Sequence, residues 1–418
     1  MDIELMKKIL TDNRRIVSEM QFIDREIMLE DGLNYVFVGL RQAGKSFLMY
    51  QQIHKLLKAG HSLDEIVYLN MDDERLFGMV AGELDIILQA HYQLNDCKPI
   101  IFLDEIQNID HWESFARRLA NEKYRVYLTG SNAKMLSSEV ATTLGGRYMI
   151  QEVYPYSFAE YLRANGMNLK KNWQYDSKQT NAVQRVFDDY FHFGGFPESI
   201  NVAQKRAWLS VLYQKIFLGD LIARYHIRND ISLKFLVKKL SESVKQPSSF
   251  NRLANIVSSV GQKVQTSSII EYIKCMEETW MIFSIQNFAA KFAEREGAKK
   301  YYFRDNGILN LFLMDQDTSL LENRVAIELK KRFKDEVYFY NKNVEVDFYV
   351  PEQDWLIQVS YSLSDYDTYQ REIGALLKVD KLLGAKRRTV ITYSEEKAIK
   401  EKDIEIEVIP LWKWLLEK

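Results

Sequence analysis

The chain has few residues that interrupt regular structure, and few cysteines. Its 418 residues include 18 glycines and 6 prolines, about 4% and about 1.4% of the chain, where average proteins have about 7% and about 5%. This scarcity excludes a low-complexity linker, a collagen-like repeat and a long flexible tail. The two cysteines, Cys97 and Cys275, cannot form a disulfide framework, so we expect reduced thiols in a cytoplasmic protein.

Neither sign of charge is in excess, and long apolar runs are lacking. With 56 basic and 58 acidic residues the formal net charge is −2, so no global field draws the molecule to nucleic acid or to an anionic membrane. The apolar runs fall short of the roughly 20 residues that span a bilayer. The first residues also lack the pattern of a signal peptide. We therefore expect no membrane site, and any nucleic-acid site has to be local.

Periodicity divides the chain into four segments. Residues 1–155 alternate apolar strand-like runs with helical runs, which predicts a mostly parallel sheet covered on both faces by helices. Residues 156–230 are mainly helical, and residues 231–318 show three short helices followed by a strand, the order of a winged helix. Residues 319–418 predict a smaller α/β module. The predicted fold class is α/β.

A phosphate-binding motif lies in the first segment. Residues 39–46 read GLRQAGKS, which matches G-x-x-x-x-G-K-[ST], follows an apolar strand and opens a helix. Glycines let backbone N–H groups curl round phosphates, and the helix N-terminus adds a positive potential. Lys45 is expected to reach the β- and γ-phosphates and Ser46 to ligate Mg²⁺; for Arg41 a solvated loop residue is a simpler interpretation than a catalytic one. The residues expected to bind ATP are Gly39, Leu40, Arg41, Gln42, Ala43, Gly44, Lys45, Ser46 and Phe47.

Two acidic residues, Asp104 and Glu105, follow the apolar run of residues 100–103. The carboxyl end of such a strand lies at the crevice where α/β sheets bind ligands. We expect Asp104 to hold Mg²⁺ through its water shell and Glu105 to polarise the attacking water. The alternative, a strand end capped by two solvated acids, is disfavoured by the phosphate loop upstream.

Polar residues next to two further strands are candidates for a catalytic role. Ser131 and Asn132 end the strand-like run of residues 124–132. Either of them could hydrogen-bond the γ-phosphate or the water, and a purely structural turn is the alternative. Arg147 follows two glycines just before the next strand and could stabilise transition-state charge, in its own subunit or in a neighbour's. A surface ion pair is the alternative role. The catalytic candidates are Lys45, Glu105, Arg147 and Asn132.

The motif order resembles the AAA-type branch of P-loop ATPases, in which the strand with the polar residue is inserted between the loop strand and the Asp-Glu strand. More closely, the chain resembles a bacterial and archaeal family of single-chain AAA-type ATPases with a winged-helix segment and a C-terminal restriction-endonuclease-like domain of unknown function. The resemblance implies ATP binding and ATP hydrolysis with Mg²⁺, but it indicates no protein partner. It spans nearly the whole chain through GLRQAGKS, IIFLDEIQ, LTGSN, LGGRY, PYSFAEYL, FGGFPE, NRVAIELKKR and VEVDFYV.

The last segment resembles the restriction-endonuclease type only in part. Those nucleases hold Mg²⁺ with a helix Glu, a strand Asp and a Glu-x-Lys on the following strand. Here Glu328 and Asp347 match the first two positions, but Gln358 and Ser360 stand where Glu-x-Lys is expected. Glu345, on the same strand face as Asp347, is the nearby residue that could substitute. We predict an inactive nuclease fold that serves structure or binding.

Basic residues gather in the middle of the chain, with 12 basic and 7 acidic residues between Arg228 and Lys300. Some of them could contact DNA phosphates; the alternatives are a solvated helix face, inter-domain packing or the binding of a partner. We predict a nucleotide-driven switch or motor. The alternatives are a nucleotide-gated DNA-binding or signalling module with little turnover and a DNA-cleaving effector. The candidate DNA contacts are Lys234, Lys238, Lys239, Arg252 and Lys263.

Overall fold

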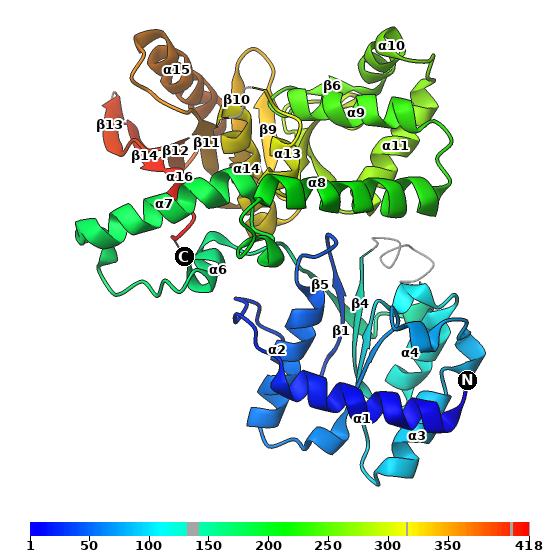
Figure 1. The fold of residues 1–418 in the computed structure, drawn as a ribbon. Coiled ribbons are helices and arrows are strands. Elements are labelled where there is room, and N and C mark those ends of the chain that lie inside the picture. Colours follow the sequence, from blue (N-terminus) through cyan, green and yellow to red (C-terminus); the bar gives the residue numbers. More distant parts are fainter. Residues whose placement is uncertain (132–141, 315–316, 402–403, 418) are drawn as a thin grey trace. The chain divides into compact units, whose positions relative to one another are not determined.

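The computed structural model describes residues 1–131, 142–314, 317–401 and 404–417. The chain forms two compact units, one of Met1–Pro155 with Glu278–Trp280 and one of Tyr156–Glu277 with Met281–Lys418 (Figure 1). Across the described ranges, no helix is both long enough and apolar enough to cross a membrane.

The first unit is built on a parallel five-stranded sheet flanked by helices (Figure 1). The strand order is β2-β3-β4-β1-β5, so β4 lies between β1 and β3. This arrangement confirms the α/β fold class and the AAA-type strand order. The strands are β1 (Asn34–Val38), β2 (Ile66–Asn70), β3 (Ile100–Asp104), β4 (Arg125–Gly130) and β5 (Tyr148–Glu152). The helices are α1 (Ile3–Glu19), α2 (Lys45–Lys58), α3 (Ile86–Leu94), α4 (Trp112–Asn121) and the 3-10 turns Leu63–Glu65, Glu74–Leu76, Ala81–Glu83 and Ile106–Asn108.

Aromatic side chains fill the core between the sheet and α2. Tyr127 of β4 stacks on Phe102 of β3 with 4.6 Å between ring centroids, and on Tyr35 of β1 at 6.1 Å. These rings belong to one buried cluster with Leu48 and Ile53 of α2. The packing fixes α2, and with it the loop that precedes α2, against the sheet.

Helix α1 covers the outer edge of the sheet. Asn13 donates from Nδ2 to the carbonyl oxygen of Tyr68 at 3.0 Å, and Arg14 donates from Nε to the carbonyl oxygen of Ile66 at 3.1 Å. Because β2 is an edge strand, these two donors satisfy carbonyl groups that would otherwise be open to another chain.

The second unit contains a nine-stranded mixed sheet in the order β13-β14-β12-β11-β10-β9-β7-β8-β6. The strands are β6 (Ser248–Ser249), β7 (Ile282–Asn287), β8 (Ala298–Phe303), β9 (Tyr338–Asn341), β10 (Glu345–Val350), β11 (Trp355–Val359), β12 (Arg387–Thr392), β13 (Lys397–Glu401) and β14 (Ile404–Pro410). The helices are α6 (Phe158–Ala164), α7 (Ser177–Phe193), α8 (Lys205–Lys215) with a π-helical continuation (Ile216–Ala223), α9 (Asp230–Glu242), α10 (Phe250–Val260), α11 (Thr266–Glu278), α12 (Phe292–Gly297), α13 (Asn306–Asn310), α14 (Asp317–Phe333), α15 (Tyr366–Leu383), α16 (Leu411–Trp414) and the 3-10 turns Trp173–Tyr175, Pro197–Ser199 and Pro351–Gln353.

The sheet crosses the boundary that the sequence predicts between residues 318 and 319. Strand β7 pairs in parallel with β9, with Gln286 opposite Tyr338. The three helices α9, α10 and α11 are followed by the antiparallel pair β7 and β8, and β6 pairs with β8. Residues 231–318 and 319–418 therefore belong to one unit, because backbone hydrogen bonds join their strands.

The FGGFPE motif forms a tight corner after α7. Gly194 has φ of +76°, and a Cβ there would lie 1.9 Å from Oδ1 of Asp305. The buried Asp305 carboxylate accepts hydrogen bonds from the backbone N–H groups of Gly195 at 2.9 Å and Gly307 at 2.7 Å. This corner fastens α7 to the segment around α13, a structural role for the two glycines.

Candidate functional site

The phosphate-binding loop joins β1 to α2 in a conformation that requires its glycines. Gly39 and Gly44 have φ of +146° and +94°, which side chains disfavour. A Cβ on Gly39 would lie 2.2 Å from the carbonyl oxygen of Val153. Helix α2 begins at Lys45, and among the described residues no side chain caps its N-terminus. The first N–H groups of α2 are therefore available to an anion.

Lys45 is buried within this loop. Its side chain is 4% exposed, and Nζ donates to the carbonyl oxygens of Gly39 and Leu40 at 3.1 Å each. These bonds keep the ammonium group at the loop backbone, where it can meet a phosphate bound by the same loop.

Ser46 and Asp104, the two expected Mg²⁺ residues, lie close together. The Ser46 hydroxyl lies close enough to the carboxylate of Asp104 to lower its pKa, and this carboxylate, 1% exposed, accepts hydrogen bonds from Tyr68 Oη at 2.8 Å and from Thr129. The pKa of Asp104 is raised overall, because burial and then the adjacent Glu105 outweigh the lowering effect of the hydroxyls of Ser46, Thr129 and Tyr68. A hydroxyl and a carboxylate side by side are the hard oxygen donors that Mg²⁺ prefers, so this pair fits the ion.

Glu105 is held beside Asp104 in a left-handed conformation, with φ of +51°. Its backbone N–H donates to Thr129 Oγ1 at 2.8 Å, and its half-buried carboxylate accepts from Gln107. Thr129 thus fixes both acidic residues. Thr129 lies within the LTGSN motif, where only Ser131 and Asn132 are expected to act, and Tyr68 lies in none of the motifs. The signal that would find them is a polar side chain near the carboxyl end of each strand flanking β3.

Ser131 follows β4 beside the start of the loop, because Gly130 of β4 pairs with Val38 of β1. Ser131 is 2% exposed, and its Oγ has no hydrogen-bond partner among the described residues. A buried hydroxyl left unbonded costs about 1–3 kcal/mol, so a group next to a phosphate loop that lacks a partner is suited to a ligand. Asn132, the alternative to Ser131, lies outside the described residues.

Arg147 lies at the amino ends of the sheet strands, whereas the phosphate loop lies at their carboxyl ends. Tyr148 of β5 pairs with Asn34 at the start of β1, whereas the loop follows Val38 at its end. At about 3.3 Å per residue, these positions are about 13 Å apart along the strand. The exposed guanidinium of Arg147 bonds nearby carbonyl groups, those of Leu144 and Gly145. The structure therefore does not bring Arg147 to the phosphate loop of its own chain.

Arg25 supports the loop from behind, a contact that no motif indicates. The buried guanidinium donates to the carbonyl oxygens of Ala43 at 3.0 Å and of Tyr154 at 2.6 Å. Of the other expected ATP-binding residues, Arg41 is half-buried. Phe47 is 38% exposed and packs edge-on against Tyr50 with 5.5 Å between ring centroids.

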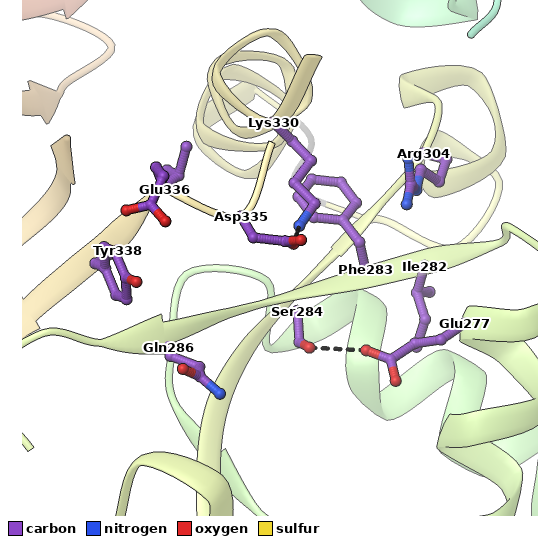
Figure 2. A pocket seen from close by; sticks show the side chains of 11 residues that line it. Glu277, Ile282, Phe283, Ser284, Gln286, Arg304, Lys330, Asp335, Glu336 and Tyr338 are labelled. Carbon is purple, nitrogen blue, oxygen red and sulfur yellow. Dashed lines mark hydrogen bonds and ion pairs between the residues drawn. The ribbon is translucent and has the colours of Figure 1, made fainter. Parts of the chain in front are cut away.

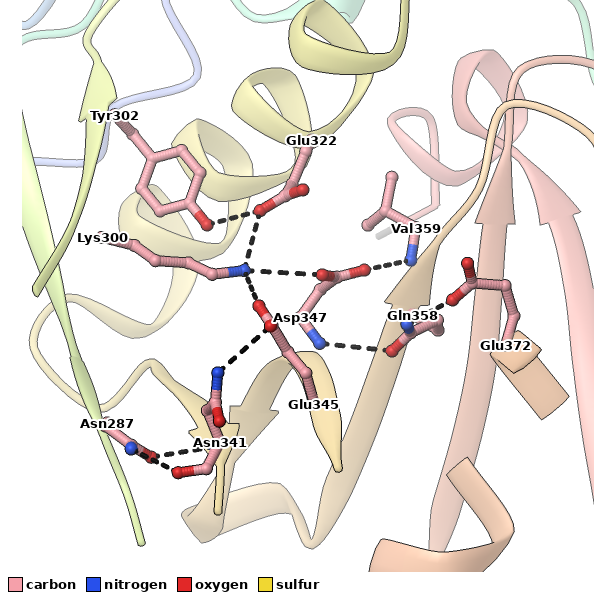
Figure 3. A network of polar contacts seen from close by, with 10 residues as sticks. All are labelled: Asn287, Lys300, Tyr302, Glu322, Asn341, Glu345, Asp347, Gln358, Val359 and Glu372. Carbon is pink, nitrogen blue, oxygen red and sulfur yellow. Dashed lines mark hydrogen bonds and ion pairs between the residues drawn. The ribbon is translucent and has the colours of Figure 1, made fainter. Parts of the chain in front are cut away.

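A second polar cluster lies in the second unit, around Asp347 of β10 (Figure 3). Its helix carboxylate is Glu322 of α14, because Lys300 Nζ contacts both Glu322 Oε1 at 3.1 Å and Asp347 Oδ1 at 3.5 Å. The expectation of Glu328 in this position is wrong. Glu328 lies six residues after Glu322, which places it about 240° round the helix, on another side of α14. There it pairs with Arg324 at 3.2 Å and with Arg332 at 2.9 Å.

Strand β11 contributes to this cluster through its backbone and the side chain of Gln358. The backbone N–H of Val359 donates to Asp347 Oδ2 at 2.9 Å, and Gln358 Oε1 accepts the backbone N–H of Asp347 at 3.2 Å. Gln358 also donates to Glu372 of α15. Ser360 bonds instead to the carbonyl oxygen of Ser362, so its hydroxyl does not take the place of a catalytic lysine.

Another pocket, of about 370 Å³, lies between β7 and the end of α14 (Figure 2). Ser284 donates to Glu277 at 2.7 Å, and Lys330 pairs with Asp335. Burial raises the pKa of Glu277. These two pairs satisfy one another, and we assign the pocket no ligand.

The expected DNA contacts lie on two helices and a turn. Lys234 and Lys238 are exposed on α9, Lys239 is half-buried there, Arg252 is exposed on α10, and Lys263 precedes α11. Nζ of Lys234 pairs with Asp230 at 3.0 Å, which reduces the charge that this lysine offers to a phosphate.

Comparison with known proteins gives two family matches and two relatives along nearly the whole chain. An AAA domain matches residues 33–162, and a domain of unknown function matches residues 184–319. The uncharacterized protein MJ1544 of Methanocaldococcus jannaschii is 31% identical, over 99% of this chain and 95% of that protein. An uncharacterized protein of Haemophilus influenzae is 26% identical, over 97% of this chain and 100% of that protein. The Walker-type ATPase PABY2304 of Pyrococcus abyssi has a TM-score of 0.43 at 12% identity, over 74% of this chain and 95% of that one.

Proposed function

Because the chain belongs to the same family as protein MJ1544 and carries an AAA domain, we propose that it binds ATP with Mg²⁺ and hydrolyses it, using the energy as a switch or motor. The observation that carries this proposal is that Ser46 at the start of α2 lies close enough to the buried Asp104 at the end of β3 to lower the pKa of its carboxyl. Residues 58 positions apart meet beside the phosphate loop with the donor atoms that a Mg²⁺–phosphate complex needs.

Each residue of the site then has a defined task. Loop N–H groups and Lys45 bind the phosphates, and Ser46 and Asp104 would hold Mg²⁺, which supplies charge stabilisation there. Glu105 orients and deprotonates the attacking water, and Thr129 keeps its backbone in place. The Ser131 hydroxyl has no hydrogen-bond partner in the described part of the chain, which supports its contact with the terminal phosphate.

Steady-state phosphate release tests the proposal. Lys45→Ala is expected to abolish ATP binding and turnover, and Glu105→Gln to retain binding while slowing turnover by about 10²-fold or more. Lys58→Ala is the matched control, because Lys58 ends the same helix and is exposed. Equal turnover by the wild type and Lys45→Ala would contradict ATPase activity.

A second function, nucleotide-gated DNA binding, is supported by the order of elements in residues 231–318. Helix α9, strand β6, helices α10 and α11 and the hairpin β7–β8, with β6 paired to β8, follow the order of a winged helix. Exposed Arg252 and Lys263 lie on this segment. A gel-shift series at rising salt, with and without ATP, tests it; Arg252→Ala should weaken binding and flatten the salt dependence. Failure to bind at low salt would contradict it.

A further inference from the structure

A fully buried lysine lies at the centre of the carboxylate cluster in the second unit. Lys300 of β8 is 0% exposed, and its Nζ lies 2.8 Å from Glu345 Oε1, 3.1 Å from Glu322 Oε1 and 3.5 Å from Asp347 Oδ1. Figure 3 shows the ammonium group between these three carboxylates, which come from α14 and β10. A lysine is buried this completely only when its charge is balanced.

The other contacts of the cluster fix the carboxylates around this ammonium group. Tyr302 donates to Glu322 Oε1 at 2.8 Å, and Asn341 donates to Glu345 Oε2 at 3.1 Å. The backbone N–H of Val359 holds the far oxygen of Asp347. Each carboxylate thus has one partner besides Lys300, and the three converge on a single cation.

The presence of Gln358, where the nuclease pattern Glu-x-Lys has a glutamate, also fits this arrangement. Gln358 accepts from the backbone of Asp347 and donates to Glu372. A glutamate at position 358 could not donate, and its charge would face the carboxylate of Glu372. The amide therefore completes the network, and it contributes no negative charge that would call for a divalent ion.

The implied nuclease metal does not fit this centre. Mg²⁺ needs oxygen ligands at about 2.0–2.1 Å in near-octahedral geometry, and an ammonium group already contacts one oxygen of each carboxylate. Two cations within about 4 Å repel strongly where water is excluded. A metal could enter only if the fully buried Lys300 side chain left the cluster.

We propose that the ammonium group of Lys300 takes the place of the divalent cation, so that the cluster is a metal-free centre that does not cut phosphodiesters. Lys300 belongs to residues 231–318, and its partners belong to residues 319–418. The resident cation therefore also ties these two segments together. The cavity beside the cluster, of about 570 Å³ and lined in part by Glu322, Asp347 and Glu372, is then a structural remnant of a nuclease site.

Mn²⁺ binding to the nucleotide-free full chain tests this proposal. We expect Asp347→Asn to leave the number of bound Mn²⁺ ions unchanged, because the wild-type cluster binds none. Lys300→Met should gain one Mn²⁺ site, at least tenfold tighter than any binding at the wild-type cluster, and the double variant with Asp347→Asn should lose it. Lys299→Met is the matched control, since the neighbouring Lys299 pairs with Glu296 at 2.8 Å outside the cluster.

The proposal would be overturned if the wild-type chain bound an Mn²⁺ ion that the Asp347→Asn variant does not bind. It would also be overturned if Lys300→Met folded but gained no Mn²⁺ site. If Lys300→Met does not fold, the comparison of the wild type with Asp347→Asn still decides. Plasmid incubated with the wild type and Mn²⁺ should stay intact, and cleavage that Asp347→Asn abolishes would equally overturn the proposal. Any ion at the phosphate loop is common to all these chains and cancels in the comparison.

Discussion

The hydroxyl group of Thr129 donates a hydrogen bond to the carboxylate of Asp104, across the neighbouring strands β4 and β3. The same hydroxyl accepts the backbone N–H of Glu105 at 2.8 Å. One side chain therefore sets the position of both acidic residues at the end of β3.

Replacing Thr129 by valine keeps the shape of the side chain and removes the hydroxyl. Asp104 then loses a donor that lowers its pKa, and the N–H of Glu105 loses its acceptor. We expect ATP turnover to fall about tenfold or more and the Mg²⁺ requirement to rise, measured as kcat over a Mg²⁺ titration. The exposed Thr11→Val is the control, and unchanged kcat in Thr129→Val would refute a positioning role.

Ser131→Ala separates a functional hydroxyl from a structural one. Because Ser131 Oγ has no hydrogen-bond partner among the described residues, its removal should leave the free energy of unfolding unchanged or raise it by about 1 kcal/mol. ATP turnover should nevertheless drop about tenfold. Urea unfolding and phosphate release measured on the same sample check both outcomes, and a destabilised chain with normal turnover would mean that Ser131 is structural.

Arg147→Ala should reveal whether the arginine acts on a neighbouring molecule. Its place at the amino edge of the sheet excludes direct contact with the phosphate loop of its own chain. We expect wild type and variant to turn over ATP equally at high dilution, and to diverge as protein concentration rises and chains associate. A turnover deficit that is the same at every concentration would contradict action between chains.

The Asp347 cluster should make stability depend on pH. Burial and then Glu322 raise the pKa of Asp347 to about 8, against the lowering effect of Lys300. Between about pH 4 and pH 8 the folded cluster keeps a proton that the unfolded chain releases, so this contribution is present at low pH and is lost as the pH rises towards 8. Urea unfolding from pH 5 to pH 8 should show a steeper decline for the wild type than for Asp347→Asn. Parallel curves would contradict a protonated cluster.

Contiguous motifs made the first unit predictable. The strand–loop–helix pattern locates the phosphate loop, and the alternation of strands with helices predicts the α/β fold class that the structure confirms. The motifs alone do not single out Thr129, which lies within LTGSN, or Tyr68, because their contacts with Asp104 depend on strand order and register.

The polar cluster of the second unit was harder to predict for two reasons. Glu322 and Glu328 lie on different sides of the same helix, and the order of a helix Glu before a strand Asp does not tell which of them faces Asp347. Lys300 lies 22 residues from Glu322 and 47 from Asp347, and it reaches them only because β8, β7, β9 and β10 are consecutive in one sheet. Without that pairing, nothing in the sequence distinguishes the role of Lys300 from that of the neighbouring Lys299 on the same strand.

The pairing of β7 with β9 has a practical consequence for expressing parts of this protein. A chain cut between residues 318 and 319 would leave one fragment with β7 and the other with β9 as new open edges. Open edges of this kind recruit strands from other molecules, so each fragment is expected to aggregate when produced alone. The two fragments produced together should recover soluble protein by rejoining the sheet, which makes this position a natural place for a split-protein complementation assay.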